Sequence, residues 1–339
     1  MILGRNKLSL LHLPTPLDHL SNISKDLGID LYIKRDDMTH IGMGGNKLRK
    51  LEYLVNDAIN RGSTMLVTEG GAQTNHGRLT AAVATKLGLK CAIVTSDDYP
   101  GEISSNLLLD GIMNCPIYFK PKDGIHSSNE RFKLCGEEVI EKYESQGEKV
   151  YFIPLGGSNE LGALGYYECS MELTKQAKDM AIEDALVVST IGSMGTYMGL
   201  AVGLNNENSK LGLVGISIMP YPMDINIYAK DYLNRINEFY GISTNPEFNI
   251  ITKYDKGAYN NLDEDVRNAI YYMAKKEAII LDPCYTGKAF AGLIDMVNNG
   301  DIKKGSKIIF LHTGGQPGIN SLHHRKAMEK ELLENIHII

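Results

Sequence analysis

A chain of 339 residues is long for one hydrophobic core and suits two unequal domains or one large domain with an insertion. Acidic and basic residues nearly balance at a formal net charge of -6, and no basic run could follow a phosphate backbone, so nucleic acid is not expected as a partner. No apolar run reaches the roughly 18 residues of a membrane helix. The N-terminal "SLLHLPTPL" is broken by His12, Pro14 and Pro16, so a signal peptide is not expected either.

The cysteines and histidines exclude several other classes of site. The five cysteines are odd in number, widely spaced and without a C-x-x-C pair, which predicts reduced thiols in a cytoplasmic protein. The chain has no H-E-x-x-H and no G-x-S-x-G motif, and His323 and His324 are neighbours that cannot face one another on a helix. We therefore expect no metal site and no serine esterase chemistry.

Apolar segments rich in β-branched residues alternate with helical patterns along the chain. The predicted strands lie within "DLYIKR", "TMLVTEGG", "KCAIVTSD", "CPIYFKP", "KVYFIPLGG", "DALVVSTIG", "KLGLVGISIM", "AIILDP" and "KIIFLHTGG". Amphipathic patterns over residues 46–62 and 77–89 predict helices between them. This alternation predicts an α/β protein with open, twisted, mostly parallel sheets and helices on both faces. Such sheets bind ligands beyond the carboxyl ends of their strands.

The first segment that could carry chemistry is "GMGGNKLRKLE", residues 42–52. Lys47 stands where a glycine-rich loop becomes a helix. It could be an ordinary surface charge, or an amine held close to a ligand. The segment is not a P-loop, because Leu48 follows the lysine where a magnesium-binding hydroxyl is needed.

The second segment is "TEGGAQTNHGRLTAA", residues 68–82, where a strand passes into a helix. It carries four polar residues in a row, Gln73, Thr74, Asn75 and His76. Helix capping accounts for one or two of them and does not need all four. The others are candidates for a binding site.

The third segment is "ALVVSTIGSMGTYMGLAVGL", residues 185–204, in which a strand runs into a turn containing Gly192, Ser193, Gly195 and Thr196. Free amides at such a turn and helix start can bind phosphate. The alternative is a tight turn with glycines such as Gly199 for close packing. A dinucleotide site would need an acidic residue roughly 20 positions later, which "LGLVGISIMP" lacks, so a small phosphorylated cofactor is favoured.

Two further segments, "LDPCYTGKAFAGL" and "FLHTGGQPGI", place polar residues after apolar runs near the C-terminus. Tyr285 and Thr286 follow the first run, and His312 ends the second. A lone tyrosine more often serves packing than chemistry. At the end of a predicted strand, among these loops, Tyr285 is an equally good candidate for the site.

Five motifs together carry a resemblance to a known family. They are "GGNKLRKLE", "GGAQTNHGR", "IPLGGSNELGALGY", "DPCYTGKAFAGL" and "HTGGQPG". In this order, over nearly the whole chain, they resemble the fold type II pyridoxal phosphate enzymes of the D-cysteine desulfhydrase and 1-aminocyclopropane-1-carboxylate (ACC) deaminase family. The resemblance implies a large cofactor-binding domain of residues 1–49 and 160–339, a small domain of residues 50–159, and a homodimer.

The resemblance also implies which residues bind the cofactor. Lys47 would be the Schiff-base lysine, and Asn75 would bond the phenolic oxygen of the ring. The residue after the tyrosine, Thr286, would contact the pyridine nitrogen. The phosphate would be held by Lys50, Ser193, Met194, Gly195 and Thr196.

The substrate-binding residues implied by the family lie in two of the motifs. Thr74, Asn75 and His76 would lie beside the substrate carboxylate and Cα, and Tyr285 would face the substrate, with Thr74 and Tyr285 among the catalytic residues. Tyr259, in "GAYNN", corresponds to a second catalytic tyrosine. This chain reads "YNNL" where the family usually has Y-G-x-P.

Two departures from the ACC deaminase pattern favour β-elimination. ACC deaminases carry glutamate at the position of Thr286, which keeps the pyridine nitrogen protonated and the ring a strong electron sink. A hydroxyl cannot hold a full proton there, so the carbanion is less delocalised, which elimination of a good leaving group tolerates. The chain also reads "TNH" where ACC deaminases tend to read "SNQ".

The predicted reaction is a lyase reaction on a small amino acid. Lys47, freed by the substrate, would remove the Cα proton, the β-substituent would leave, and aminoacrylate would hydrolyse to pyruvate and ammonia. D-Cysteine, which releases sulfide, is the first choice, with L-cysteate, D-serine, β-chloroalanine, diaminopropionate and ACC as alternatives. Two other classes stay open: a nicotinamide oxidoreductase, and a pyridoxal phosphate carrier or sensor without turnover.

Overall fold

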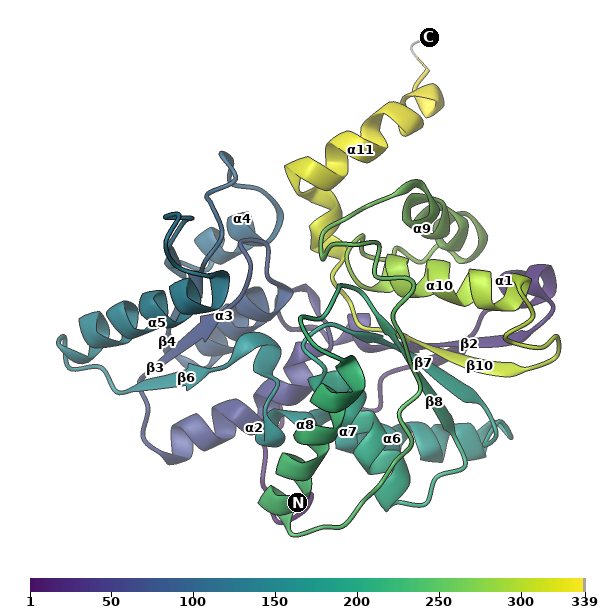
Figure 1. Cartoon of the computed structure of the whole chain (residues 1–339), viewed down its shortest axis with the longest axis horizontal. Coiled ribbons are helices and arrows are strands. Elements are labelled where there is room, and N and C mark those ends of the chain that lie inside the picture. The colour runs from purple at the N-terminus through teal and green to yellow at the C-terminus, as the bar shows by residue number, and fades with distance from the viewer. Residues whose placement is uncertain (338–339) are drawn as a thin grey trace.

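The computed structural model describes residues 1–337, which form two sheets joined by helices (Figure 1). The larger sheet has the strand order β1-β2-β10-β7-β8-β9, and the smaller has the order β5-β4-β3-β6. Their bounds are β1 Leu17–His19, β2 Asp30–Arg35, β3 Met65–Glu69, β4 Lys90–Thr95, β5 Ile117–Phe119, β6 Val150–Ile153, β7 Leu186–Ile191, β8 Gly212–Ser217, β9 Ile250–Ile251 and β10 Lys307–His312.

Helices follow most of these strands. They are α1 Ser21–Leu27, α2 Lys47–Asn60, α3 Asn75–Leu87, α4 Ser105–Ile112, α5 Ser128–Glu144, α6 Glu160–Asp179, α7 Gly195–Asn206, α8 Ile225–Tyr240, α9 Glu264–Glu277, α10 Thr286–Asn298 and α11 Leu322–Leu332. Short 3-10 turns are η1 Asp36–Met38, η2 Ile41–Met43, η3 Leu155–Gly157, η4 Gln316–Asn320 and η5 Leu333–Asn335. In Figure 1, α11 extends from the body at the top of the view, and the N-terminus lies at the bottom.

The predicted α/β class with mostly parallel sheets is confirmed. Every strand pair in both sheets is parallel except β1 with β2, which is antiparallel at the edge of the larger sheet. All strands of the smaller sheet fall within residues 50–159, and all strands of the larger sheet fall outside that range. This distribution supports a division into two domains, and the boundaries themselves, the first of which falls inside α2, stay a proposal.

Helices cover both faces of each sheet, as the unbroken apolar strands predict. One face of the larger sheet packs in a core with α1, α9 and α10, and the other packs with α6, α7 and α8. The smaller sheet has α2 and α3 on one side and α5 on the other. The covered faces are mainly apolar, and the exceptions within the strands include Lys34, Thr68 and Ser189.

The strand predicted over residues 278–283 is wrong, because this segment is irregular. Its side chains Ile279 and Leu281 are buried in the core, as a strand would require. However, both sides of the nearby strand β10 are already paired, with β2 and β7, so no edge is free for it. Asp282 then turns the chain directly into α10 by accepting the amides of residues 284, 285 and 286.

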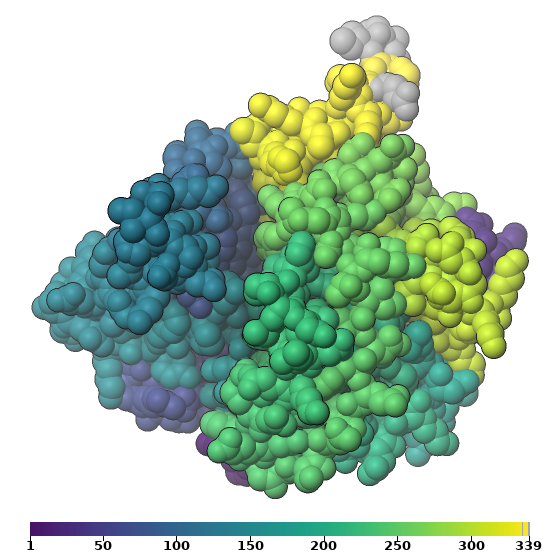
Figure 2. Space-filling model, in the orientation of Figure 1, coloured from purple at the N-terminus to yellow at the C-terminus, as the bar shows by residue number. Residues whose placement is uncertain are grey.

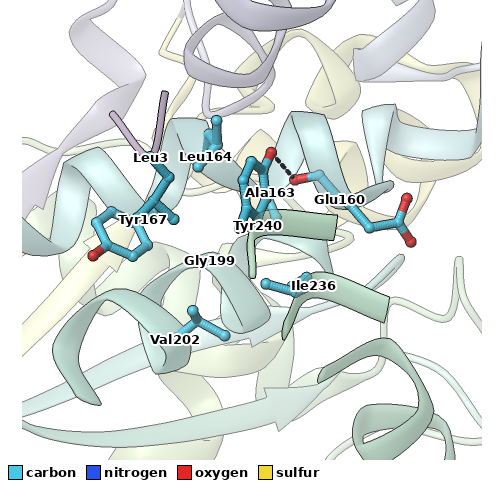
Figure 3. A pocket seen from close by; sticks show the side chains of 9 residues that line it. All are labelled: Leu3, Glu160, Ala163, Leu164, Tyr167, Gly199, Val202, Ile236 and Tyr240. Carbon is cyan, nitrogen blue, oxygen red and sulfur yellow. Dashed lines mark hydrogen bonds between the residues drawn. The ribbon is translucent and has the colours of Figure 1, made fainter. Parts of the chain in front are cut away.

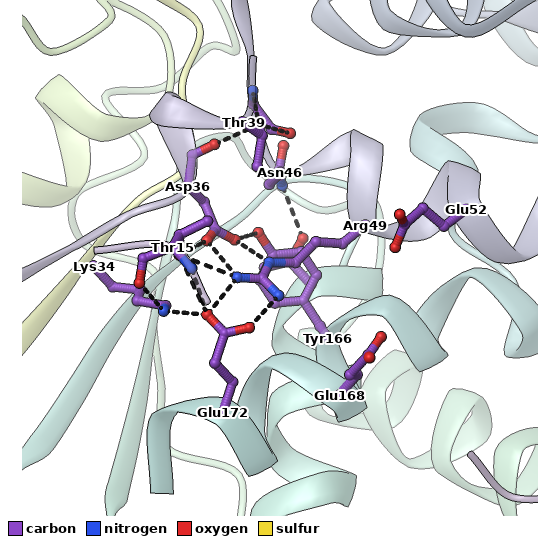
Figure 4. Close-up of polar contacts among 12 residues, drawn as sticks. Thr15, Lys34, Asp36, Thr39, Asn46, Arg49, Glu52, Tyr166, Glu168 and Glu172 are labelled. Atoms are coloured by element: carbon purple, nitrogen blue, oxygen red, sulfur yellow. Dashed lines mark hydrogen bonds and ion pairs between the residues drawn. The ribbon is translucent and has the colours of Figure 1, made fainter. Parts of the chain in front are cut away.

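A buried ion network fixes α2 on the side that faces the larger sheet (Figure 4). Arg49 donates to both oxygens of Asp36 at 2.8 and 2.9 Å and to both oxygens of Glu172 at 3.0 Å. Lys34 contacts Glu172 and donates to the carbonyl of Thr15 at 2.7 Å. Burial alone would raise the pKa of Asp36, but Arg49 holds it below its usual value. Two cations and two carboxylates thus lie together in the interior with their charges balanced.

Close packing sets the position of the same helix against α6. A β-carbon at Gly165 of α6 would lie 2.4 Å from the backbone carbon of Arg49 and 2.6 Å from the nitrogen of Lys50, so only glycine lets the helices approach this closely. The first turn of α2 is therefore fixed by backbone contact with α6 and by the ion network around Arg49.

The carboxyl ends of the strands face the region where the two lobes meet. Figure 2 shows the surface hollowed between the lobe that contains α3, α4 and α5 and the lobe that contains α8. The loops after β3, β7 and β10, and the first turns of α2, α3, α7 and α10, supply the sequence segments singled out above. In parallel α/β sheets this edge is where ligands bind.

Candidate active site

The glycine-rich loop places the start of α2 tightly against the loop that follows β10. Gly44 has φ 71° and a β-carbon there would lie 2.1 Å from the carbonyl oxygen of Asp37. The backbone of Asn46 donates to the carbonyl of Thr313 at 2.9 Å. Arg78 of α3 donates to the carbonyl oxygens of Gly42 and Gly44. Contacts with Asp37, Thr313 and Arg78 thus fix the loop, and Lys47 follows it as the first residue of α2.

Lys47 and Lys50 lie one helical turn apart, so their side chains project from the same face of α2. Both are buried, at 8% and 0% exposure. Burial lowers the pKa of Lys47 to about 8. Burial, and next the charge of Lys47, lower the pKa of Lys50 well below its ordinary value. The lysines face a glycine turn at η3, where a β-carbon at Gly156 would lie 3.2 Å from Lys47 Nζ.

Hydroxyl groups and glycines line the space around these amines. Lys50 Nζ donates to Ser158 Oγ at 3.1 Å and to the carbonyl of Gly156 at 3.2 Å, and Ser158 Oγ lies 2.7 Å from Ser193 Oγ. A β-carbon at Gly195 would lie 2.8 Å from Lys50 Nζ. Neither lysine forms an ion pair with a carboxylate in the described chain. Two buried amines beside hydroxyls and a helix start fit an anionic group such as a phosphate, whose charge would favour their protonated forms.

The start of α7 completes this anion site. Met194 precedes the helix with φ 65°, a conformation that is unusual for a residue with a side chain, and no side chain caps the helix. The Thr196 hydroxyl accepts from the side-chain amide of Asn46 at 2.9 Å, which links this turn to the residue before Lys47. Gly199, in contrast, is a packing glycine, because a β-carbon there would lie 2.3 Å from the carbonyl of Ala163.

The polar run at the start of α3 divides into capping and site residues. Thr74 caps the helix by accepting the amide of Gly77 at 3.2 Å. His76 is 2% exposed, and neither of its ring nitrogens has a hydrogen-bond partner within the described residues. Burial, and then the charges of Lys47 and Lys50, lower the pKa of His76 well below its ordinary value, so the ring is neutral. A β-carbon at Gly157 would lie 3.2 Å from this ring, which places it at the lysine turn.

Two tyrosines form a second cluster beside Gly192, at the start of the loop between β7 and α7. The hydroxyls of Tyr259 and Tyr285 contact one another, and their rings meet edge to face at 5.6 Å between centroids. A β-carbon at Gly192 would lie 3.1 Å from the Tyr285 ring. Burial raises the pKa of Tyr285, so its proton is held at neutral pH. The chain that reads "YNNL" therefore still brings Tyr259 against Tyr285.

Lys288 was not recognised in the sequence as a residue that shapes this cluster. It is fully buried, and its three Nζ protons are shared among four carbonyls within hydrogen-bond distance: Ile218 at 2.8 Å, Asp255 at 3.1 Å, Ala258 at 2.5 Å and Tyr259 at 3.1 Å. These bonds hold the loop that carries Tyr259. The only signal in the sequence is a charge inside the otherwise apolar start of α10.

Thr286 is the first residue of α10 and is fully buried. Its hydroxyl donates to Asp282 Oδ1 at 2.7 Å and accepts from the backbone amide of Asp282 at 2.9 Å. A hydroxyl has one proton, so Thr286 has none left to donate to a ligand. Asp282, which the sequence analysis did not single out, therefore decides what Thr286 can offer.

The structure brings the candidate residues together in three places. Lys47, Lys50, Ser193 and Gly195 meet at the Gly156–Ser158 turn, and His76 reaches the same turn. Tyr259 and Tyr285 lie beside Gly192, at the start of the 192–195 loop. Asn75 lies beside Gly315, where a β-carbon would come within 3.0 Å of its Nδ2.

A small cavity and a surface groove elsewhere in the molecule lack such buried, unpaired amines. A cavity of about 10 Å³ between α6, α7 and α8 is lined mainly by apolar side chains, with the Tyr240 hydroxyl donating to the carbonyl of Glu160 at 2.9 Å (Figure 3). It has room for at most one water molecule. A larger groove of about 630 Å³ lies on the outer side of α9 and α10, where Lys256 is already paired with Asp265. Neither contains a buried amine without a carboxylate partner.

Comparison with protein families gives one match over most of the chain. Residues 8–314 match the family described as pyridoxal-phosphate dependent enzyme. The chain belongs to this family. Its cofactor is therefore pyridoxal phosphate, and the anion site at Lys50, Ser158 and Ser193 fits the phosphate group of that cofactor.

Several relatives of this pyridoxal phosphate enzyme carry a reaction in their names. A D-cysteine desulfhydrase of Serratia proteamaculans is 37% identical over 322 residues, which are 94% of this chain and 96% of the relative. A D-cysteine desulfhydrase of Yersinia enterocolitica is 38% identical over 324 residues, with the same shares covered. A crystal structure of an ACC deaminase homologue superposes with a TM-score of 0.84 at 35% identity, covering 98% of this chain and 97% of that one. The predicted family is thus confirmed.

Three further features of the described residues concern membrane-spanning helices, metal ligands and cysteines. Within residues 1–337, no helix is both long and apolar enough to cross a membrane. No group of three or more histidine, cysteine, aspartate or glutamate residues is arranged to hold a metal ion in this part of the chain. All five cysteines are free thiols.

Proposed function

We propose that this enzyme catalyses α,β-elimination from a small amino acid, with D-cysteine as the preferred substrate and pyruvate, sulfide and ammonia as products. The observation that carries the proposal is the pair of buried lysines, Lys47 and Lys50, which face glycines and hydroxyls in a chain that aligns over 94% of its length with D-cysteine desulfhydrases. Lys50, Ser158, Ser193 and the first turn of α7 hold the phosphate, and Lys47 takes the position of the reactive amine.

Lys47 has the properties of a base for the Cα proton. Its pKa of about 8 leaves a useful fraction of the amine neutral near pH 7, where an ordinary lysine would be almost fully protonated. Bound pyridoxal phosphate supplies an electron sink for the charge that develops at Cα. His76 is neutral and its ring nitrogens have no partner among the residues that the structure describes, so its N–H can donate a hydrogen bond to the substrate carboxylate, and the Thr74 hydroxyl can be a second donor.

The tyrosine pair serves the leaving group. Tyr285 retains its proton at neutral pH and its hydroxyl contacts that of Tyr259, so the pair can donate hydrogen bonds to the sulfur as it departs as hydrosulfide. Thr286 offers no proton to the pyridine nitrogen, and a glutamate in its place would bring a second carboxylate against Asp282. Both features support elimination of a good leaving group over opening of a cyclopropane ring.

A panel of amino acids tests this function. We expect kcat/KM for D-cysteine, measured as pyruvate and sulfide, to exceed kcat/KM for ACC, measured as 2-oxobutyrate, by about a hundredfold, or roughly 2.7 kcal/mol of differential transition-state binding. L-Cysteine, L-cysteate, D-serine, β-chloroalanine and diaminopropionate complete the panel. A preference for ACC would contradict the argument from Thr286, and cofactor binding without turnover of any member would identify a carrier or sensor.

The depressed pKa of Lys47 predicts the pH dependence of cofactor uptake. Because the neutral amine reacts with the aldehyde of the cofactor, the uptake rate of the cofactor-free protein should rise about tenfold per pH unit below pH 8 and level off above it. A lysine with its ordinary value of 10.5 would give a rate that continues to rise past pH 9. The change of the visible absorption after mixing, followed by stopped flow from pH 6 to 10, separates these outcomes.

We also propose that the enzyme acts in the cytoplasm as a homodimer. The free thiols of all five cysteines support a reducing compartment, and the resemblance to the family supports the dimer.

A further inference from the structure

Asn106 lies at the start of α4, in a segment that touches both halves of the molecule. The adjacent Ser105 donates its hydroxyl to the carbonyl of Pro317 at 2.6 Å, which ties the segment to the loop after β10. Asn106 itself is fully buried. Its side chain points to the start of α3, where Asn75 lies.

The direction of the Asn106 side-chain amide is forced by its neighbours. Its Nδ2 donates to the backbone carbonyl of Gln73 at 2.7 Å, and a carbonyl can only accept. The same Nδ2 donates its second proton to Asn75 Oδ1 at 2.9 Å. Asn106 Oδ1 has no partner within the described residues, so this oxygen does not set the orientation. If the amide were reversed, it would place an oxygen against the carbonyl oxygen of Gln73.

The Gln73 side chain also fixes the position of Asn106, by bonding the backbone of the segment that carries it. Its Oε1 accepts the backbone amide of Asn106 at 2.9 Å, and its Nε2 donates to the carbonyl of Ser104 at 3.0 Å. Both ends of the Gln73 amide are therefore used to hold residues 104–106 in place. This explains why a glutamine precedes Thr74 without having a place in the site itself.

The fixed direction of the Asn106 amide in turn sets the direction of the Asn75 amide. Because its Oδ1 must accept from Asn106, its Nδ2 is directed away from Asn106, toward Gly315 in the loop after β10. The two amide protons of Asn75 have no acceptor within residues 1–337, so they are available for a ligand at the strand ends. An asparagine whose direction was not fixed could present its oxygen instead.

We propose that Asn106 is a positioning residue, which turns the donor end of the Asn75 amide toward the phenolic oxygen of pyridoxal phosphate. The inference rests on the proposed function of this site. Only a donor is favourable there, because the phenolic oxygen carries negative charge in the bound form and would repel a carbonyl oxygen. Asn106 has no contact with the cofactor and acts only through Asn75.

The test replaces Asn106 by aspartate, which keeps the shape and removes the donor. In the Asn106→Asp variant Asn75 is expected to reverse, donate to the new carboxylate and present its oxygen to the cofactor. We expect the Kd for pyridoxal phosphate to rise about tenfold to a hundredfold, as for loss of a hydrogen bond to a charged group. The Kd for 3-deoxypyridoxal phosphate, which lacks the phenolic oxygen, should change less than about twofold.

Controls separate orientation from general damage. Ser105→Ala removes the neighbouring buried bond without touching the amides, and it should leave both Kd values unchanged. In an Asn75→Ala background, Asn106→Asp should have no further effect. If Asn106→Asp does not fold, Asn106→Leu, which removes the donor without adding charge, is measured against the same two ligands, with a loss expected for pyridoxal phosphate alone.

The outcomes also distinguish this inference from the proposed function. Equal losses for both ligands, or no loss for either, would overturn the role of Asn106. Failure of the unchanged protein to bind pyridoxal phosphate would overturn the site as a whole. The visible absorption of the loaded protein gives a second measurement, because Asn106→Asp should lower the fraction in the long-wavelength form at a given pH.

Discussion

Replacing Lys47 by alanine is expected to lower turnover at least about ten-thousandfold while the protein still binds pyridoxal phosphate. The variant loses the proposed reactive amine, but the proposed phosphate site, where Lys50 donates to Ser158 and Ser158 contacts Ser193, is unchanged. Pyruvate formation measures the first effect, and equilibrium dialysis of the cofactor measures the second. Lys50→Met is the matched comparison, because it should weaken cofactor binding instead.

Chemical labelling tests the same assignment in the unchanged protein. Borohydride reduction followed by peptide mapping should place the cofactor on Lys47. The other buried lysines are engaged elsewhere: Lys34 contacts Glu172 and Gln176, and Lys288 is surrounded by four carbonyls. A label on Lys34, Lys50 or Lys288 would show that the amine has been assigned to the wrong residue.

The Arg49→Met variant is expected to lose about 3–5 kcal/mol of the free energy of unfolding, because it leaves two buried carboxylates with one cation. Arg49 is 1% exposed and bonds both oxygens of Asp36 and Glu172. Methionine fills much the same volume, so the loss reports the charge and not a cavity. Urea unfolding followed by circular dichroism measures the effect.

Arg61 offers a control at the other end of the same helix. It pairs with Asp57 at 2.9 Å, but its side chain is 67% exposed. Arg61→Met should cost less than about 1 kcal/mol, as is usual for exposed ion pairs. Equal losses in the two variants would mean that burial of the Arg49 network adds nothing to stability. Because Arg49 adjoins Lys50 in sequence, a smaller loss in cofactor affinity should accompany the first variant alone.

The two tests probe opposite faces of α2. One face carries Lys47 and Lys50 toward the strand ends, where burial lowers the pKa of both amines and neither has a carboxylate partner within the described residues. The other carries Arg49 into a network that is balanced within the protein. Three cationic residues within four positions thus have separate tasks, which the helical repeat of 3.6 residues permits.

Much of the fold could be predicted from local patterns. Long apolar runs that alternate with amphipathic segments located β2, β3, β4, β7, β8 and β10, together with α2 and α3, because burial of both sheet faces imposes that periodicity. Residues 278–283 have the same apolar composition but form no strand, since both sides of β10 are occupied. The edge strands β1 and β9 were not predicted, because β1 reads "LDH" and is mostly polar, and β9 has only two residues.

Part of the candidate site could likewise be predicted from local motifs, and part depends on contacts between distant residues. Glycine loops at helix starts and the order of five motifs were sufficient to predict the family and to single out Lys47, because these features are contiguous in the chain. The partners that orient the site are distant: Asn106 reaches Asn75 over 31 positions, and Lys288 reaches Ile218 over 70. Hydrogen bonds of this kind depend on which loops the sheets bring together, and no local periodicity records them. Only the tertiary structure could therefore decide that the Asn75 side-chain oxygen accepts from Asn106 and that the Thr286 hydroxyl donates to Asp282.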